Sequence, residues 1–402
     1  MKKIIVNLLL LLFGIMVATL MAEGVVRVFK LSFLWDGVRR GYYNDDMARF
    51  HIQDRTFRYL PKPNLDVILQ KWQGEFKMRW QTNSKGFRSG EVPYRRTDKK
   101  KRVLFLGDSF GWGFGVSNPE LFSYILQSRY DDILEIVNLS VTGYGLPQEY
   151  LMYRTEGVKY APDVVIQLFC MTNDIYPYTK STDDDIKNTN GPYFVLKNNN
   201  AYFQPKKYSL VSKEEFDQLG RRRGFLNGVR FIIQTHSALS NLLFERLSRF
   251  HQLIPFLRKV GGTTFIVEEL MPTIREKDAF MTAKVLKKFK SEAKDNGSDF
   301  IVVVIPDIYH VDAAIKKGTI DYTDKTFKPI FWLTKQLESE GIQHINLLEE
   351  FTSAKWKDKR MYYIIDRHLN PEGHKALAEI IANFLFEHQF KDMSTLFRRE
   401  AP

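Results

Sequence analysis

The sequence contains one cysteine, Cys170, so no disulfide can form within the chain. The fold must therefore be held together by its core, and 402 residues, 44% of them hydrophobic, can bury a sizeable one. The eight histidines show no mutual ligand spacing such as His-x-x-x-His. The alternating glycines 111, 113 and 115 lack the Lys-Ser or Lys-Thr that completes a phosphate-binding loop. We therefore expect neither a metal site nor a cofactor.

The protein is basic, with a formal net charge of +12 and a pI of about 9.4. The lysines and arginines are spread along the chain, and no nucleic-acid-binding motif accompanies them. We therefore expect no nucleic-acid partner, and an anionic lipid surface is favoured instead.

The amino terminus supports a membrane partner. Residues 4–22 are apolar except for Asn7 and Thr19, which is long enough to cross a hydrocarbon core that needs ~20 helical residues. Lys2 and Lys3 favour a cytoplasmic start, although four basic residues between positions 27 and 40 reduce the charge contrast. We predict an uncleaved single-pass anchor at 1–22 with an extracytoplasmic domain, periplasmic or extracellular. A signal peptide cleaved after Ala22 is the alternative.

Beyond the anchor, residues 23–100 are predicted to form an accessory segment without long helical periodicity. Alternating strand and helix patterns begin at Lys101 and continue to about residue 392, before a tail at 393–402. Buried strands are expected at 102–106, 133–139, 163–169, 299–306 and within 342–351, and helices at 121–130, 147–160, 279–297, 327–341 and 376–390. We predict an α/β fold, a three-layer α/β/α domain around a mostly parallel sheet of about five strands. Residues 175–273 interrupt the alternation and are interpreted as an insertion.

The first of these strands runs into Gly107-Asp108-Ser109, which places a hydroxyl where the apolar pattern stops. In an open parallel sheet, ligands bind at the carboxyl ends of the strands. A serine there is a weak nucleophile unless a base takes its proton, so the hypothesis requires a histidine at another strand end. His368 follows the apolar run 361–365 and precedes the last helix, and Asp366 lies two residues before it. A helix cap at Asp108 or Ser109 is the simpler structural alternative.

Four blocks in this order resemble the SGNH hydrolase superfamily, also called GDSL esterases and lipases. They are Gly107-Asp108-Ser109, residues 138–143, residues 171–174, and the segment with Asp366 and His368. The resemblance implies a flavodoxin-like SGNH fold and a Ser109–His368–Asp366 triad. It also implies that the N–H groups of Ser109 and Gly143, with the Asn173 amide, stabilise the oxyanion.

Two positions depart from the family pattern. Met171 stands where the third block usually has glycine, and Arg367 alone separates Asp366 from His368, where two residues usually intervene. The shorter spacing is similar to that of SGNH-like polysaccharide O-acetyltransferases such as those acting on alginate.

The sequence thus favours a membrane-anchored serine esterase that forms an acyl-enzyme and acts on an envelope lipid, glycan or acylated sugar. An O-acyltransferase that modifies an extracytoplasmic polysaccharide is the first alternative, and a catalytically silent glycan-binding protein is the second. Trp112, in a flexible glycine-rich rim, and Asn83 and Arg88, in the turn at 82–88, are predicted to bind substrate. His374 is expected to be structural.

Overall fold

The computed structural model describes residues 2–29, 50–70, 75–96, 99–175, 179–180, 191–210, 212, 239, 274–364 and 366–391. The chain divides into two units, one of residues 1–49, 68–78 and 213–263, the other of residues 50–67, 79–212 and 264–402. The domain boundaries expected from the sequence remain predictions.

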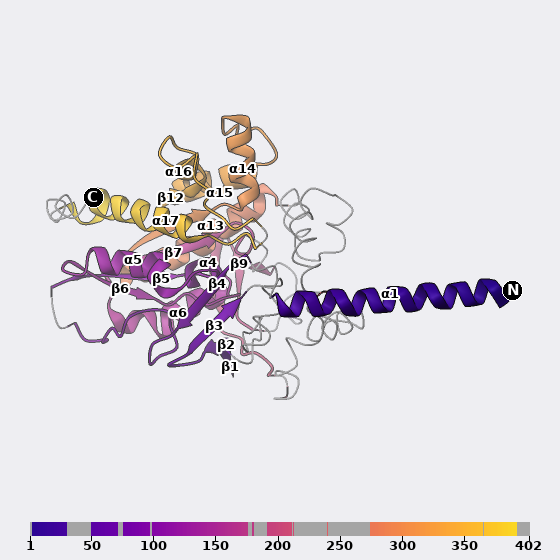
Figure 1. Ribbon diagram of the computed structural model, residues 1–402. Helices are drawn as coiled ribbons and strands as arrows, with labels where there is room; N and C mark the ends of the chain where they lie inside the picture. Colours follow the sequence, from indigo (N-terminus) through magenta and orange to yellow (C-terminus); the bar gives the residue numbers. More distant parts are fainter. Residues whose placement is uncertain are drawn as a thin grey trace. The chain divides into compact units, whose positions relative to one another are not determined.

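The first unit contains helix α1 (Lys2–Val28), drawn in indigo in Figure 1. Residues 6–28 of α1 have a mean hydropathy of 2.3 in their most apolar window, and the helix is long enough to cross a membrane. A membrane anchor and a signal sequence both have these properties.

The second unit is built around a five-stranded sheet with the order β12-β11-β7-β5-β6. Its strands are β5 (Lys101–Leu106), β6 (Leu134–Asn138), β7 (Val164–Cys170), β11 (Asp299–Ile305) and β12 (Gln343–Asn346). All neighbouring strands are parallel. Every residue of β7 is buried, as expected for a central strand covered on both faces. The predicted flavodoxin-like α/β sheet is confirmed.

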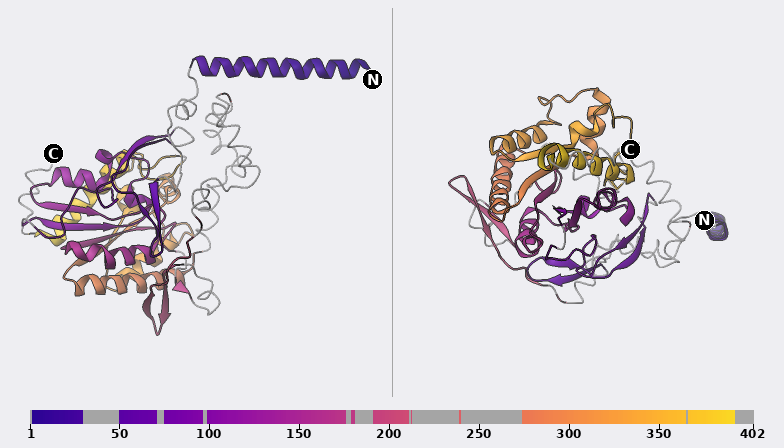
Figure 2. Two further views of the ribbon diagram at one scale, coloured as in Figure 1. Left: turned by 90° about the horizontal axis from the view of Figure 1, so that it is seen from below. Right: turned by 90° about the vertical axis from the view of Figure 1, so that its left-hand side faces the viewer.

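Helices cover both faces of this sheet, as Figure 2 shows. On one face α5 (Phe122–Arg129) packs against α17 (Pro371–Phe384). The other face carries α6 (Leu146–Thr155), α13 (Glu276–Asp295) and α15 (Lys328–Ser339). Phe289 of α13 contacts the rings of Tyr150, Tyr153 and Phe300, which joins two helices to the sheet. The hydrophobic core therefore has two layers.

Two helices differ from the sequence prediction. The last one begins at Pro371 rather than at 376, because the Asn370 side chain accepts a hydrogen bond from the Gly373 N–H and Pro371 suits the first helical turn. It ends in a π-helical turn at Leu385–Gln389. Helix α14 (Ile308–Lys317) was not predicted; the Asp307 carboxylate caps it by accepting from the Tyr309 N–H. Shorter helices are α4 (Ser109–Trp112) and α16 (Leu347–Phe351), with 3-10 turns at Asn118–Glu120 and Gly157–Tyr160.

The accessory segment contributes small sheets. Strands β1 (His51–Asp54) and β2 (Arg58–Pro61) form an antiparallel hairpin, and β3 (Asp66–Gln70) pairs with β4 (Lys77–Gln81). Within the predicted insertion, β8 (Thr179–Lys180), β9 (Tyr193–Lys197) and β10 (Asn200–Gln204) form a three-stranded sheet. The acidic run at 183–185 and, apart from residue 239, the helical pattern at 231–253 lie outside the described residues.

Candidate active site

The turn after β5 presents Ser109 at the carboxyl edge of the sheet. A Cβ on Gly107 would lie 2.9 Å from the Cβ of Leu168, so only glycine lets the chain leave the strand this close to β7. The Asp108 carboxylate accepts a hydrogen bond from the Phe110 N–H at 2.8 Å and caps α4, and Ser109 is the first residue of that helix. The cap is thus Asp108, which leaves the Ser109 hydroxyl for other contacts.

His368 lies against this hydroxyl. Its Nε2 is 2.7 Å from Ser109 Oγ, and its Nδ1 is 2.5 Å from Asp366 Oδ1. The His368 side chain is 20% exposed, whereas that of Asp366 is 2% exposed. An ionised carboxylate can only accept, so Nδ1 carries the proton and Nε2 is free to accept one from Ser109. The geometry is that of a nucleophile, a base and an orienting acid.

The short Asp-x-His spacing is accommodated by the backbone of Arg367. This residue has φ +73°, a left-handed conformation that non-glycine residues seldom adopt. Its guanidinium donates to Asp307 Oδ1 at 2.9 Å, and the Tyr363 N–H donates to the His368 carbonyl at 2.9 Å. The loop is therefore tied to the end of β11. Sequence reasoning missed Asp307, although an acid directly after a buried strand is the signal that could have revealed it.

Besides the Ser109 N–H, the candidate oxyanion donors are Gly143 and Asn173, which follow the two strands beside β5. Phe105 of β5 is paired with Asn138 of β6, and the Val141 N–H donates to the Gly107 carbonyl at 3.0 Å. Parallel register thus carries Gly143, which has φ +74° and an exposed backbone, along the same edge as Ser109. After β7, the Asn173 amide nitrogen donates to Asp108 Oδ2. The oxyanion roles of Ser109, Gly143 and Asn173 stay predictions.

Three buried carboxyl groups lie together beneath the site, and sequence reasoning did not identify them as a group. Asp108, Glu149 and Asp174 have no more than 1% exposure. Burial raises the pKa of each; the Asp108 charge raises the pKa of Glu149 further, and the charges of Glu149 and Asp108 raise that of Asp174. Glu149 accepts from Gln167 and Asp174 from the Cys170 N–H, which fixes the turn after β7.

Aromatic rings surround the histidine. The ring centroids of Phe110 and Phe114 lie 4.9 and 5.0 Å from that of His368, and Trp80 packs at 5.6 and 5.5 Å against Trp112 and Phe114. Such apolar walls exclude water and strengthen the electrostatic interactions of the catalytic groups.

The residues predicted to bind substrate lie inside the protein. Trp112 and Arg88 are each 1% exposed and Asn83 is 9% exposed. Asn83 organises its own turn by accepting from the N–H groups of Lys85 and Phe87. The burial of Trp112 and the contacts of Arg88 and Asn83 correct the expectation of a flexible rim, and the substrate-binding roles stay predictions.

Arg88 shows this most clearly. Its guanidinium donates to the carbonyls of Trp112, Gly113 and Val116 and to the Asn118 side chain, at 2.7 to 2.9 Å. Burial lowers its pKa to about 9. The glycine-rich segment after Ser109 is thus pinned by a buried cation rather than left free.

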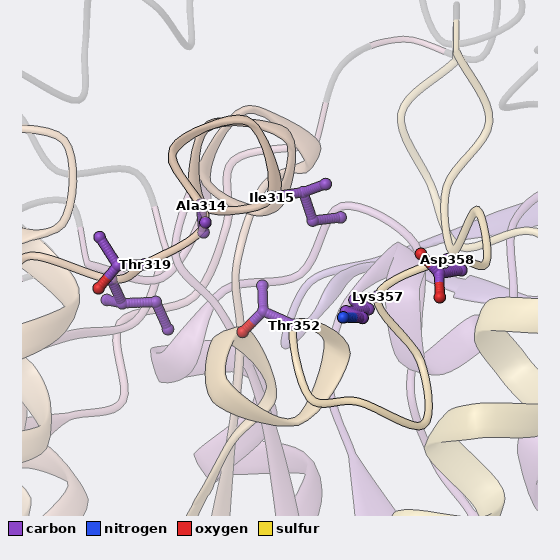
Figure 3. A pocket seen from close by; sticks show the side chains of 8 residues that line it. Ala314, Ile315, Thr319, Thr352, Lys357 and Asp358 are labelled. Carbon is purple, nitrogen blue, oxygen red and sulfur yellow. The ribbon is translucent and has the colours of Figure 1, made fainter.

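A surface hollow of about 440 Å³ lies elsewhere in the second unit (Figure 3). Its walls are Ala314, Ile315, Gly318, Thr319, Ile320, Thr352, Lys357 and Asp358. None of these residues belongs to the Ser109 cluster.

Comparison with known proteins supports the assignment of the domain. A sequence profile of a family described as an SGNH hydrolase-like domain of the acetyltransferase AlgX matches residues 265–397, which include Asp366 and His368. A search of curated proteins found no match.

Solved structures with some similarity were found as well. They include a lipase/acylhydrolase from Enterococcus faecalis, with 11% identity, a TM-score of 0.36, and coverage of 71% of this chain and 95% of the other. An acetyl xylan esterase, AlAXEase, has 11% identity, a TM-score of 0.35, and coverage of 70% and 98%. A member of the lipolytic protein G-D-S-L family from Veillonella parvula has 10% identity, a TM-score of 0.35, and coverage of 72% and 98%.

Three observations agree on the type of domain. They are the strand order of the sheet, the match of the family profile, and the contact between Ser109 and His368 at the carboxyl edge of the sheet. Residues 265–397 are therefore similar to an SGNH hydrolase-like domain.

Proposed function

We propose that this protein is a membrane-anchored serine acyltransferase that forms an acyl-enzyme on Ser109 and passes the acyl group, an acetyl group, to a hydroxyl of an extracytoplasmic polysaccharide. The observation that carries the chemistry is the chain of contacts from Asp366 to His368 to Ser109, at 2.5 and 2.7 Å. The match to the AlgX acetyltransferase profile over the segment with Asp366 and His368 favours transfer.

The first half-reaction loads the enzyme. Ser109 Oγ attacks the acyl carbonyl of a donor ester while its proton passes to His368 Nε2, 2.7 Å away. The oxyanion develops toward the N–H groups of Ser109 and Gly143 and the Asn173 amide. Asp366 stabilises the imidazolium that forms. The imidazolium then gives its proton to the departing alkoxide, which leaves Ser109 acylated.

The second half-reaction decides the product. A sugar hydroxyl gives its proton to His368 and attacks the acyl group, and the ester bond to Ser109 breaks as the serine regains a proton. Water in the same position would make the protein an esterase. The partial exposure of His368, at 20%, favours this second candidate because it leaves one side of the base open to solvent.

The location fits a polysaccharide acceptor of the cell envelope. Residues 6–28 provide a helix of sufficient length and hydropathy to anchor the domain. We propose that this helix is retained and that the domain lies on the extracytoplasmic side, with the net charge of +12 favouring an anionic lipid surface.

The test uses the full chain in detergent, with p-nitrophenyl acetate as donor. Mass spectrometry is expected to find acetate on Ser109, and Ser109→Ala is the matched control. Adding uronic-acid or neutral oligosaccharides should then divert the acetyl group from free acetate to sugar ester. Free acetate alone, with every acceptor tried, supports the esterase. A folded wild type without acetylation or fluorophosphonate labelling at Ser109 refutes both candidates.

A further inference from the structure

The β1–β2 hairpin of the accessory segment contacts the loop that carries Gly143. Tyr59 on β2 is 4% exposed, and its hydroxyl donates a hydrogen bond of 2.8 Å to the carbonyl oxygen of Thr142. The Thr142 carbonyl and the Gly143 N–H belong to one peptide group. A residue outside the four sequence blocks thus holds the peptide from which a candidate oxyanion donor comes.

Peptide geometry links the two ends of this group. The Thr142–Gly143 bond is trans, so its carbonyl and N–H point in opposite directions in one plane. A donor fixed on the carbonyl therefore fixes the direction of the N–H. It also polarises the peptide, which makes the N–H a stronger donor to a developing negative charge. In the described part of the chain, the Gly143 N–H has no acceptor.

The hairpin packs tightly enough to hold this orientation. A Cβ on Gly143 would lie 2.7 Å from the Tyr59 hydroxyl oxygen, so only glycine fits at its φ of +74°. The Tyr144 hydroxyl donates to the Tyr59 carbonyl at 2.5 Å, and Thr142 Oγ1 lies 3.4 Å from His51 Nε2. Gln148 donates to the Phe57 carbonyl at 3.0 Å. Both sides of the loop are thus joined to the hairpin.

We propose that Tyr59 is a positioning residue for acyl transfer, which orients and polarises the Thr142–Gly143 peptide so that its N–H meets the oxyanion. The proposal rests on the proposed function above. Burial raises the pKa of the Tyr59 hydroxyl to about 12, so the group remains a neutral donor over the working range of pH. Tyr59 does not touch the reacting atoms.

The first test is the rate at which a fluorophosphonate labels Ser109 in the full chain in detergent. The phosphonyl oxygen occupies the place of the oxyanion, so Tyr59→Phe should lower the maximal labelling rate about tenfold, the factor of one lost neutral hydrogen bond, and leave the reagent's half-saturating concentration unchanged. Tyr144→Phe is the matched control, because it removes a hydroxyl from the same hairpin contact but not from the Thr142 carbonyl. It should label within about twofold of the wild type.

The second test observes the peptide directly. Thr142–Gly143 is the one Thr-Gly pair in the sequence, so carbonyl-13C threonine combined with 15N glycine gives a single correlated NMR signal. Tyr59→Phe should move this carbonyl upfield, and Tyr144→Phe should not.

The outcomes separate the two proposals. An unmoved carbonyl signal overturns the hydrogen bond, and a moved signal with unchanged labelling overturns its role in positioning. Equal slowing by both variants assigns the effect to loosening of the hairpin and also overturns it. A wild type that is never labelled at Ser109 refutes the proposed function, while the NMR signal still decides whether Tyr59 holds the peptide.

Discussion

Arg367 affects the free energy of unfolding in two ways, through its ion pair with Asp307 and through its left-handed backbone, and substitutions of this residue should separate the two. Its guanidinium pairs with Asp307, and the two side chains are 15% and 5% exposed. Removing one partner of a buried ion pair costs about 3–5 kcal/mol, and because Arg367 retains some exposure we expect about 3 kcal/mol for Arg367→Ala. The backbone conformation of Arg367 makes a second contribution to the free energy of unfolding. At φ +73°, glycine avoids a strain of about 1 kcal/mol that alanine keeps, so Arg367→Gly should cost only about 2 kcal/mol.

Urea unfolding followed by tryptophan fluorescence measures these costs, and Asp307→Ala completes a double-mutant cycle. If the ion pair carries the effect, the double variant should be about 2 kcal/mol more stable than the sum of the single variants predicts. Because Arg367 lies between Asp366 and His368, labelling of Ser109 should slow in both single variants of Arg367. Two results would refute the reasoning. One is that the free-energy losses of the Arg367 and Asp307 variants simply add in the double variant, and the other is that Arg367→Ala is as stable as Arg367→Gly.

Three further predictions concern buried polar groups. Asp366→Asn should slow labelling of Ser109 by about 10³–10⁴-fold, because the neutral amide no longer stabilises the imidazolium and its NH2 group can donate to Nδ1, which favours the wrong tautomer of His368; an unchanged rate would remove Asp366 from the triad. His310 is buried and its pKa is lowered to about 4, so its stabilising contribution is complete above pH 6.5 and is lost as the pH falls toward 4. His310→Gln should therefore lose about 2 kcal/mol less stability than the wild type between pH 7 and 4.5, as measured by urea titration, and parallel losses would contradict this. Arg88→Gln should cost about 3 kcal/mol, because three carbonyls lose a buried donor, and a melting temperature like that of the wild type would show that the rim holds without it.

Much of the fold was predictable because its signals are local. A parallel sheet covered on both faces requires continuous apolar strands, and four of the five read plainly as such, for instance residues 164–170 and 299–305. The helical pattern at 279–297 likewise predicted α13, which spans Glu276–Asp295. Helix α14 was missed because its caps, Asp307 and Gly318, enclose a segment of only ten residues.

The residues of the candidate site also differ in whether their positions could be predicted from local sequence. Ser109 and His368 were found because each follows an apolar run at the carboxyl edge of the sheet, and such positions can be read from sequence alone. The interior position of Arg88 could not be read in this manner. A basic residue in a turn usually faces solvent. Only the hydrogen bonds from the Arg88 guanidinium to the carbonyls of Trp112, Gly113 and Val116 reveal that it holds the glycine-rich segment in place.

By itself, the sequence determined the strands of the five-stranded sheet and most of the helices between them, the apolar helix at the amino terminus and the residue types at the strand ends, because periodicity and composition are properties of neighbouring residues. Only the tertiary structure decided which distant groups meet. The contacts of Arg367 with Asp307 and of Tyr59 with Thr142 span 60 and 83 positions of the chain. Such pairings depend on how the elements pack, and no local pattern in the sequence encodes them.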